Sequence, residues 1–515
     1  MSSAQPTSPE VASYRSDSSV LAVLRSPRLL TREALAGLVV GLALIPEAIS
    51  FSIIAGVDPK VGLFSSFIMA VSIAFLGGRP AMITAATGAV ALVVAPIAPR
   101  YGLDYLIATI ILAGVFQVLF GLLGVAKLMR FIPRSVMVGF VNSLAILVFI
   151  AQLPHLIGVP WLVYPLVAAG ILVIILMPRI TKAIPAPLVS VIVITTAAVV
   201  FSLNVPTVGD QGELPRSLPE LFMPQLPLTP ETFAIIAPFA FAVAIVGLLE
   251  SLLTAKLVDE ITDTHSNKTR ESWAQGVSNM LSGFFGGMGG CAVIGQTMMN
   301  VKVSGARSRV STFLAGVFLL VLVVVLGDVV SVIPMAALVA VMIMVSIAAF
   351  DWHSIAPRTL RRMPKSETFV MVVTVLVVVL THNLAIGVIV GVLVASVLFV
   401  RRVAHFVSVE RTLSSAFGVE SAHYVVTGEL FFASSNDLTT LFSYAKDPER
   451  IVIDMSQAHL WDASTVASLD AIVTKYAQRD KTVEIVGMDE AATALHTRLS
   501  GDSPQPIEWA VFTAD

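Results

Sequence analysis

The chain has 515 residues, of which 56% are hydrophobic and only 13% are charged, and its mean hydropathy is +0.88. Soluble globular domains carry about 25% charged residues, so this composition excludes a soluble enzyme and is typical of a polytopic membrane protein. The single cysteine, Cys291, excludes an intrachain disulfide. We expect no nucleic-acid partner.

The first 23 residues are polar and rich in Ser and Pro, and they lack the apolar core of a signal peptide. Residues 1–23 are therefore predicted to form a disordered cytoplasmic tail. Fourteen apolar runs that span or nearly span a bilayer follow. They lie at 33–55, 61–77, 81–98, 105–125, 135–153, 161–177, 186–203, 232–256, 272–287, 291–303, 308–326, 329–349, 367–382 and 384–400.

The third and tenth runs are interrupted, and they hold the same position in two sets of seven. Five glycines fall within residues 286–295, although glycine costs about 1 kcal/mol in a helix interior. Residues 80–94 open with proline and break before Gly88. Paired broken helices are typical of inverted-repeat transporters, where they line a cavity. Helix starts near Gly88 and Gly295 would offer N–H groups to an anion, whereas a small-residue packing face is the alternative.

The distribution of basic residues supports this count of segments. With the N-terminus inside, the external side receives only Lys60, Arg100 and Arg216, and the remaining loop Lys and Arg residues are cytoplasmic. Both termini are then cytoplasmic. The predicted transport domain covers 24–402 and contains two seven-segment repeats, 33–203 and 232–400. The second repeat is inverted because each has an odd number of segments.

The composition after Arg402 changes to that of a soluble α/β domain, 403–515. Alternating apolar residues predict strands at 424–432, 450–455 and 482–486. Amphipathic patterns predict helices at 436–444 and 463–477.

Two ionisable residues inside apolar runs are functional candidates by default, because a charge there is costly. Glu47 follows Pro46 in the first run, and Glu250 lies in the eighth run, the inverted counterpart of the first, with Thr254 one turn later. A purely structural carboxylate is the alternative for each. Other intramembrane polar residues are predicted to be interhelical hydrogen-bond partners, namely Gln117, Asn142, Gln275 and Asn279. No nucleotide-binding loop or metal-ligand spacing is present, so we expect no cofactor and no ATP-driven transport.

Four motifs lie in one characteristic order along the chain. They are residues 45–56 (IPEAISFSIIAG) with 61–63 (VGL), residues 84–90 (TAATGAV), residues 249–254 (LESLLT) and residues 286–302. With these motifs the chain resembles the SulP-type anion permeases, which include sulfate permeases, bicarbonate transporters and prestin, and its tail resembles the family's STAS domain. The resemblance implies a homodimer with core and gate parts and elevator-like motion.

The resemblance also implies a substrate site between the third and tenth segments. Its predicted members are Glu47, Ala86, Thr87, Gly88, Val293, Ile294, Gly295 and Gln296. In sodium-coupled bicarbonate members, an acidic residue and a threonine bind the cation, and these match Glu250 and Thr254. Glu in place of Asp leaves proton or sodium coupling open. Gln296 stands where some animal relatives have a supporting arginine. Asp462 precedes Ala463, where regulated STAS domains have a phosphorylated serine, so that switch is not expected.

We predict a secondary active transporter of sulfate, bicarbonate or a dicarboxylate in a bacterial plasma membrane, with a possible cytoplasmic partner for the STAS domain. A proton or a sodium ion must offset the charge of Glu250 when the anion binds, and we favour the proton because Glu is a common intramembrane proton carrier. Cys291 is predicted to lie beside the cavity. The alternatives are an anion channel, a membrane sensor that signals through the tail, and a carrier of a neutral solute such as a nucleobase.

Overall fold

The computed structural model describes residues 19–124, 127, 132–180, 185–227, 229–404, 407–416 and 419–500. It separates into two compact units, Met1–Val392 and Leu393–Asp515, and the last helix of the first unit runs across this boundary. The predicted domain limits at 402 and 403 stay a prediction. A short helix, α2 (Val20–Arg25), lies at the end of the predicted disordered tail, and residues 1–18 of that tail lie outside the described residues.

The first unit is helical, and its helices follow the predicted apolar runs. Within the described residues, seven helices are long and apolar enough to cross a membrane by length and composition. The third and tenth runs are broken, as predicted. Each consists of a two-residue strand followed by a short helix. The elements of repeat one are α3 (Pro27–Ile54), α4 (Pro59–Leu76), β1 (Thr84–Ala85), α5 (Gly88–Val94), α6 (Ile97–Tyr101), α7 (Leu103–Leu122), α8 (Arg134–Ile150), η2 (Leu153–Leu156), α9 (Val163–Ile180) and α10 (Ala186–Val200).

The second repeat contains the same kinds of element after the connection between the repeats, which holds the short helix η3 (Val208–Gln211). Its elements are α11 (Pro230–Thr262), α12 (Lys268–Phe284), β2 (Cys291–Ala292), α13 (Ile294–Met298), the π-helical η4 (Met299–Val303), α14 (Arg309–Val325), α15 (Gly327–Ser331), α16 (Met335–Ala349), α17 (Pro357–Arg362), α18 (Lys365–Thr381) and α19 (Leu384–Ala404). The predicted run at 329–349 is two helices, because Pro334 separates α15 from α16.

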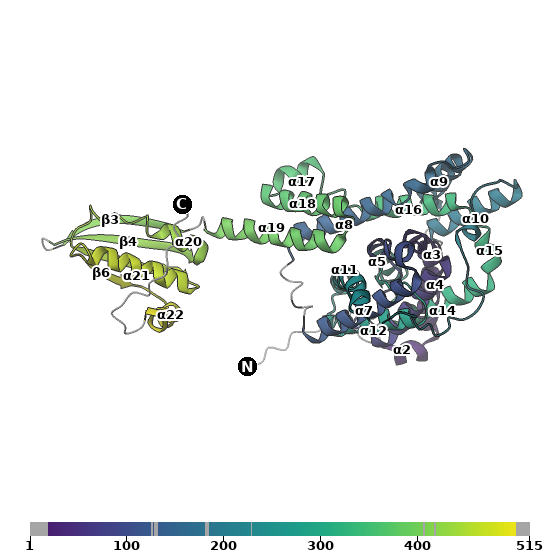
Figure 1. Cartoon of the computed structure of the whole chain (residues 1–515), viewed down its shortest axis with the longest axis horizontal. Coiled ribbons are helices and arrows are strands. Elements are labelled where there is room, and N and C mark those ends of the chain that lie inside the picture. Colours follow the sequence, from purple (N-terminus) through teal and green to yellow (C-terminus); the bar gives the residue numbers. More distant parts are fainter. Residues whose placement is uncertain are drawn as a thin grey trace. The chain divides into compact units, whose positions relative to one another are not determined.

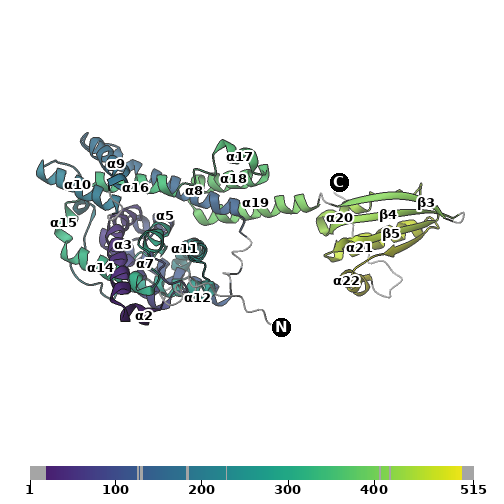
Figure 2. The ribbon, with the colours of Figure 1, turned by 180° about the vertical axis from the view of Figure 1, so that it is seen from behind.

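The helices of the first unit form two groups, each built from both repeats (Figures 1 and 2). In the core group, α3, α4, α5 and α7 pack against α11, α12, α13 and α14. In the gate group, α8, α9 and α10 pack against α16 and α18. The resemblance implies a core and a gate, and we use these names for the two groups.

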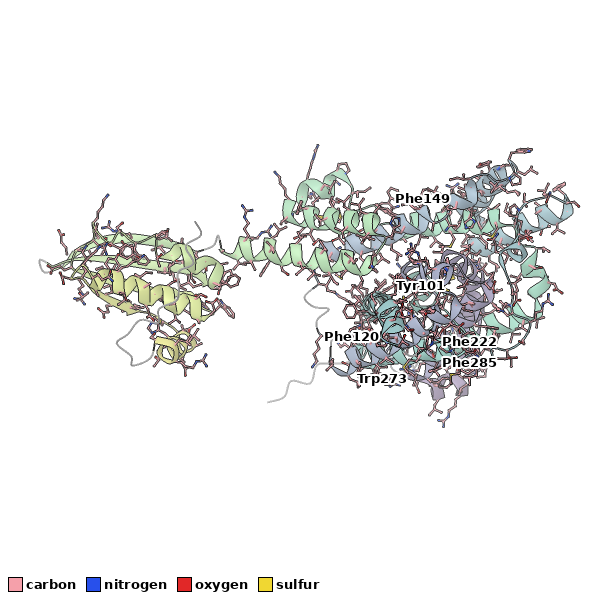
Figure 3. All side chains as sticks on the ribbon, in the orientation of Figure 1. Tyr101, Phe120, Phe149, Phe222, Trp273 and Phe285 are labelled. Carbon is pink, nitrogen blue, oxygen red and sulfur yellow. The ribbon has the colours of Figure 1, made fainter. Side chains whose placement is uncertain are left out.

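Small residues bring the helices of the core group close together. A side chain at Gly114 of α7 would meet the Gly276 carbonyl of α12 at 2.6 Å, and one at Gly276 would meet the Gly114 carbonyl at 2.5 Å. Seven residues further along α7, Gly121 lies against the backbone of Trp273; Figure 3 labels Trp273 on this group. Such spacing is how membrane helices gain packing without a hydrophobic driving force.

The second unit contains a four-stranded sheet of order β3-β4-β5-β6. β3 and β4 are antiparallel, and the β4–β5 and β5–β6 pairs are parallel. Helices α20 and α21 belong to the same unit, and α22 packs against α21. The bounds are β3 (Ser408–Ala416), β4 (Val419–Leu430), α20 (Phe432–Leu438), β5 (Arg450–Leu460), α21 (Ala463–Ala477), β6 (Thr482–Val486) and α22 (Glu490–Ser500).

Two of these elements, α21 and β6, coincide with their predicted ranges, whereas the helix predicted at 436–444 is wrong. The observed helix α20 begins at Phe432 and ends at Leu438. Beyond it the chain turns inward, because the Ser443 N–H donates to the buried Tyr424 hydroxyl at 3.0 Å and the Tyr444 ring packs 4.8 Å from that of Tyr476. Tertiary packing thus overrides the local helical pattern. Strand β3 and helix α22 were not predicted.

Candidate substrate and coupling site

The two broken segments cross and pair with each other. Thr84 lies opposite Ala292 and Ala85 lies opposite Cys291 in an antiparallel ladder, which the Val293 N–H extends by donating to the Ile83 carbonyl at 2.8 Å. Helix α5 leaves one end of this ladder at Gly88, and α13 leaves the other at Ile294, close to the predicted starts. The N-termini of both short helices therefore flank one crossing point. The pairing itself was not predicted.

The backbone of the glycine-rich stretch is satisfied by buried amide side chains of the core group. The Asn279 carbonyl oxygen accepts from the Gly290 N–H at 2.9 Å, and the amides of Asn279 and Gln275 donate to the Gly290 carbonyl at 3.1 and 3.0 Å. Gln117 of α7 accepts from Asn279 at 2.8 Å. These residues are the interhelical hydrogen-bond partners that were predicted, and they hold non-helical backbone at a depth where water is scarce.

Glu47 and Gln296 meet across the site. The Gln296 amide of α13 donates to the Glu47 carboxylate of α3 at 2.5 Å, and their exposed fractions are only 4% and 7%. Gln296 therefore places a neutral donor where the resemblance suggested a supporting arginine. Helix α3 continues through Pro46 and ends only at Ile54.

Glu250 is connected to the first broken segment through the only cysteine. The Cys291 thiol donates to the Glu250 carboxylate at 2.9 Å and shares a hydrogen bond of 3.0 Å with the Thr87 hydroxyl, which also accepts from the Val90 N–H. All three side chains are almost completely buried. The Thr254 hydroxyl donates to the Glu250 backbone carbonyl at 2.7 Å, so Thr254 lies one turn from the carboxylate on the same helix.

The glycines at the two helix starts differ in the space around them. A Cβ atom at Gly88 would lie 2.9 Å from the Phe51 ring and 3.2 Å from Val148, so Gly88 is a packing position. A Cβ atom at Gly295 would meet nothing within 4 Å. Ala86 and Val293 are buried and Ile294 is half-buried. Open space beside exposed backbone is therefore found at the start of α13.

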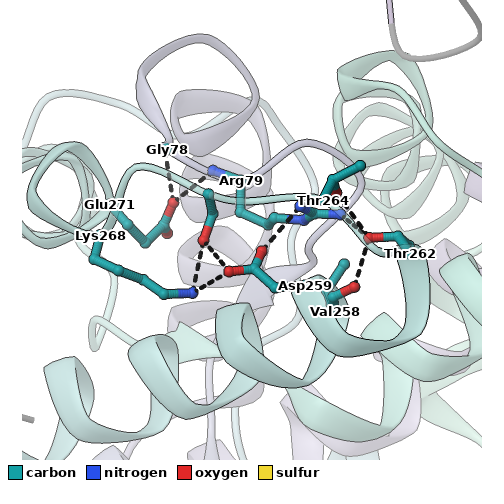
Figure 4. Close-up of polar contacts among 9 residues, drawn as sticks. Gly78, Arg79, Val258, Asp259, Thr262, Thr264, Lys268 and Glu271 are labelled. Carbon is teal, nitrogen blue, oxygen red and sulfur yellow. Dashed lines mark hydrogen bonds and ion pairs between the residues drawn. The ribbon is translucent and has the colours of Figure 1, made fainter. Parts of the chain in front are cut away.

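A charged cluster at the turn between α4 and β1 holds the N-terminal end of the first broken segment (Figure 4). The buried Arg79 guanidinium donates to Asp259 at 2.9 Å and to the hydroxyls of Thr264 and Thr262 at 2.7 and 2.6 Å. Lys268 reaches the second oxygen of Asp259 at 2.6 Å. The turn after α4 is thereby tied to the C-terminal end of α11, which carries Glu250 two and a half turns earlier.

Backbone groups of this turn are hydrogen-bonded as well. Glu271 accepts from the N–H groups of Gly78 and Arg79 at 2.6 and 3.1 Å. Ala81 adopts a left-handed φ of 60°, a strained conformation for a residue with a side chain. Its carbonyl accepts from Asn300 at 2.8 Å. Sequence reasoning counted Arg79 only as a cytoplasmic charge, because nothing local connects it with Asp259, 180 residues later.

The match to known families decides the kind of protein. The family described as the sulfate permease family matches residues 30–165 and 161–374, and the STAS domain matches residues 419–501. The chain belongs to the sulfate permease family. It is therefore a multi-pass membrane transporter and not an enzyme, as the sequence predicted.

Relatives of this sulfate permease family member cover nearly all of the chain. It is 50% identical over 469 residues to the "Putative sulfate transporter YbaR" of Bacillus subtilis, covering 91% of this chain and 97% of that one. It is 26% identical over 502 residues to the "Bicarbonate transporter BicA" of Picosynechococcus, covering 88% and 87%.

Two solved structures have the same fold as this permease. The murine Slc26a9 anion transporter in the inward-facing state aligns with a TM-score of 0.79 at 18% identity, covering 97% of this chain and 91% of that one. The transmembrane domain of the cyanobacterial bicarbonate transporter BicA aligns with a TM-score of 0.61 at 24% identity, covering 72% and 98%. The predicted polytopic helical fold with a C-terminal STAS domain is thus confirmed.

Proposed function

We propose that this permease is a secondary active transporter that carries a small oxyanion together with a cation bound at Glu250. The observation that supports this proposal most is the pairing of β1 with β2, since it brings two helix N-termini and two buried carboxylates to one place. The names of YbaR and BicA make sulfate and bicarbonate the first substrates to test.

The proposed anion site is the space at the start of α13 and beside the cap of α5. Gly295 and the neighbouring N–H groups would bind the anion, with Ala86, Thr87, Gly88, Val293 and Ile294 forming the walls. Gln296 donates to Glu47 and would orient that carboxylate at the edge of the site. The partial positive charges of the helix N-termini are the available attraction, because neither 84–94 nor 291–298 contains Lys or Arg.

The charge balance of this site requires a co-transported cation. An anion about 5 Å from the Glu250 carboxylate is repelled by roughly 3 kcal/mol at an effective dielectric constant of about 20. Binding a proton or a sodium ion at Glu250 removes this repulsion. For sodium, Thr254 and nearby backbone carbonyls would complete the site with oxygen atoms. We favour the proton, since the hydrogen bond from Cys291 already occupies one oxygen of the carboxylate.

The orientation and the assembly of the transporter belong to the same proposal. The excess of basic residues on one side supports cytoplasmic termini in a bacterial plasma membrane. The core group would move as a unit against the gate group, in a homodimer, and the STAS unit would regulate or assemble the complex through a cytoplasmic partner.

The coupling is tested with Glu250→Gln in proteoliposomes. The wild-type protein is expected to accumulate labelled sulfate or bicarbonate under an inward proton or sodium gradient, whereas Glu250→Gln binds and exchanges the anion but does not respond to the gradient. A response of the wild type to sodium at fixed pH identifies sodium as the coupling ion. Glu260→Gln, an exposed site on the same helix, is the matched control. Accumulation by Glu250→Gln at the wild-type rate would refute the assignment, and current far above carrier turnover would indicate a channel.

A further inference from the structure

The connection between α16 and α18 carries an unusual concentration of basic residues on the gate group. Four exposed cations follow within eight residues, Arg358, Arg361 and Arg362 on α17 and Lys365 at the start of α18. In the part of the chain that the structure describes, none of the four forms an ion pair. The acids of the same stretch, Asp351 and Glu367, do not pair with them there either.

Four basic residues of the core group are arranged differently. Arg79 and Lys268 are paired with Asp259. Arg270 and Arg309 donate to backbone carbonyls at the end of α4, where cations offset the helix dipole. The charges of those residues are used within the protein, whereas the charges on α17 face outward.

The connection is nevertheless held in a defined conformation. The buried Asn142 of α8 accepts from the Asp351 N–H at 2.8 Å and donates to the Ser354 hydroxyl at 2.9 Å. The His353 ring and the Thr359 hydroxyl are 3.3 Å apart, which links the turn to α17. The four cations are therefore presented from a segment anchored on a gate helix, and Figure 1 shows α17 beside α18.

Apolar side chains are exposed in the same segment. Ile355 is 43% exposed and Leu360 is 37% exposed. Because α16 and α18 are both apolar, the segment between them emerges at a membrane surface. Cations next to exposed aliphatic side chains match a surface that offers both anionic groups and acyl chains. A free phosphate ion would satisfy the cations alone.

We propose that residues 355–365, which we call the gate patch, bind the headgroups of anionic phospholipids and so anchor the gate group to the bilayer surface. A cluster of four or more Lys and Arg residues beside a membrane helix is the charge pattern that recognises such lipids. This anchor holds the gate group in place against the bilayer while the core group moves. It does not depend on which anion is transported or on the coupling ion.

The expected effect follows from the charge on the patch. Each cation near an anionic surface contributes about fivefold to lipid affinity. Arg358→Gln/Arg361→Gln/Arg362→Gln is therefore expected to weaken binding of phosphatidylglycerol about a hundredfold. High salt should weaken binding to the wild type and have little effect on the variant, because exposed charges are screened.

The test uses the full chain in nanodiscs of phosphatidylcholine with increasing phosphatidylglycerol, and titrates binding of labelled phosphatidylglycerol. Replacing the three arginines with lysine keeps the charge and should retain most of the affinity. The matched control neutralises three exposed cations of the second unit, Lys446→Gln/Arg450→Gln/Arg498→Gln, and should bind as the wild type does.

A folded, monodisperse glutamine variant with wild-type affinity for phosphatidylglycerol would overturn the proposal. An equal loss in the control would do so as well, since it would indicate a general charge effect. If the triple variant does not fold, Arg361→Gln alone decides, with a fivefold loss expected. Displacement of bound phosphatidylglycerol by inorganic phosphate at physiological concentration would assign the patch to free anions and refute a lipid anchor.

Discussion

Substitutions of two glycines near β2 are expected to have opposite effects, one on anion binding and the other on the stability of the fold. At Gly295 a new side chain meets open space, and the backbone angle there is an ordinary one. Gly295→Leu is therefore expected to leave the free energy of unfolding unchanged or to raise it by about 0.5–1 kcal/mol, since Gly is a poor helix former. Its side chain would occupy the space where the anion is proposed to meet the N–H groups.

The expected loss of function is large. Hydrogen bonds to a charged group contribute about 1.5–3 kcal/mol each, so the loss of two of them costs at least about 3 kcal/mol, roughly a hundredfold in anion affinity. Gly295→Ala should have an intermediate effect. The assay compares uptake of labelled sulfate and bicarbonate with the midpoint of thermal unfolding in the same detergent.

The contrasting variant is Gly290→Ala, five residues earlier. Its Cβ atom would lie 1.9 Å from the Ala85 carbonyl oxygen and 2.6 Å from the carbonyl carbon, so the backbones of β1 and β2 must separate. We expect a destabilisation of about 3 kcal/mol or more, at the upper end for an overpacked site. Transport at the wild-type rate by Gly295→Leu, or an unchanged unfolding midpoint for Gly290→Ala, would show that the reasoning is wrong.

Three further predictions concern other parts of the chain. Cys291 is fully buried between Glu250 and Thr87, so small thiol reagents should label it only as the core opens, and transported anion should slow this labelling; labelling indifferent to every candidate anion would place Cys291 in packed core. Truncation after Arg402 should leave a monodisperse membrane domain that binds the same anion as the full chain, measured by a ligand-dependent shift of its unfolding midpoint. Burial raises the pKa of Tyr444 to about 12, and burial and hydrogen bonding to Asp447 raise the pKa of Tyr476. Each tyrosine therefore stays protonated to a higher pH in the folded state than in the unfolded state, so the free energy of unfolding of fragment 403–515 should keep the tyrosines' full contribution below about pH 10 and fall between pH 10 and 12. A free energy of unfolding that does not change over this range in chemical denaturation would contradict the prediction.

Much of the membrane unit could be predicted from the sequence because the signals are local. A hydrophobic run reports a membrane helix through the cost of burying polar groups in lipid, and clustered glycines or a proline report where that helix breaks. The starts of α5 at Gly88 and of α13 at Ile294 were predicted on this basis to within one residue. Buried carboxylates such as Glu47 and Glu250 are visible in the sequence because a charge in an apolar run is costly.

The partners of those residues were decided by the tertiary structure. Gln296 reaches Glu47 and Cys291 reaches Thr87 only because the two inverted repeats interleave in the core group, bringing together residues 249 and 204 positions apart. The strand pairing at Thr84 and Ala292 is two residues long, too short to leave a periodic pattern in the sequence. Hydropathy and helix propensity depend on near neighbours along the chain, whereas these contacts depend on which surfaces of distant helices pack together.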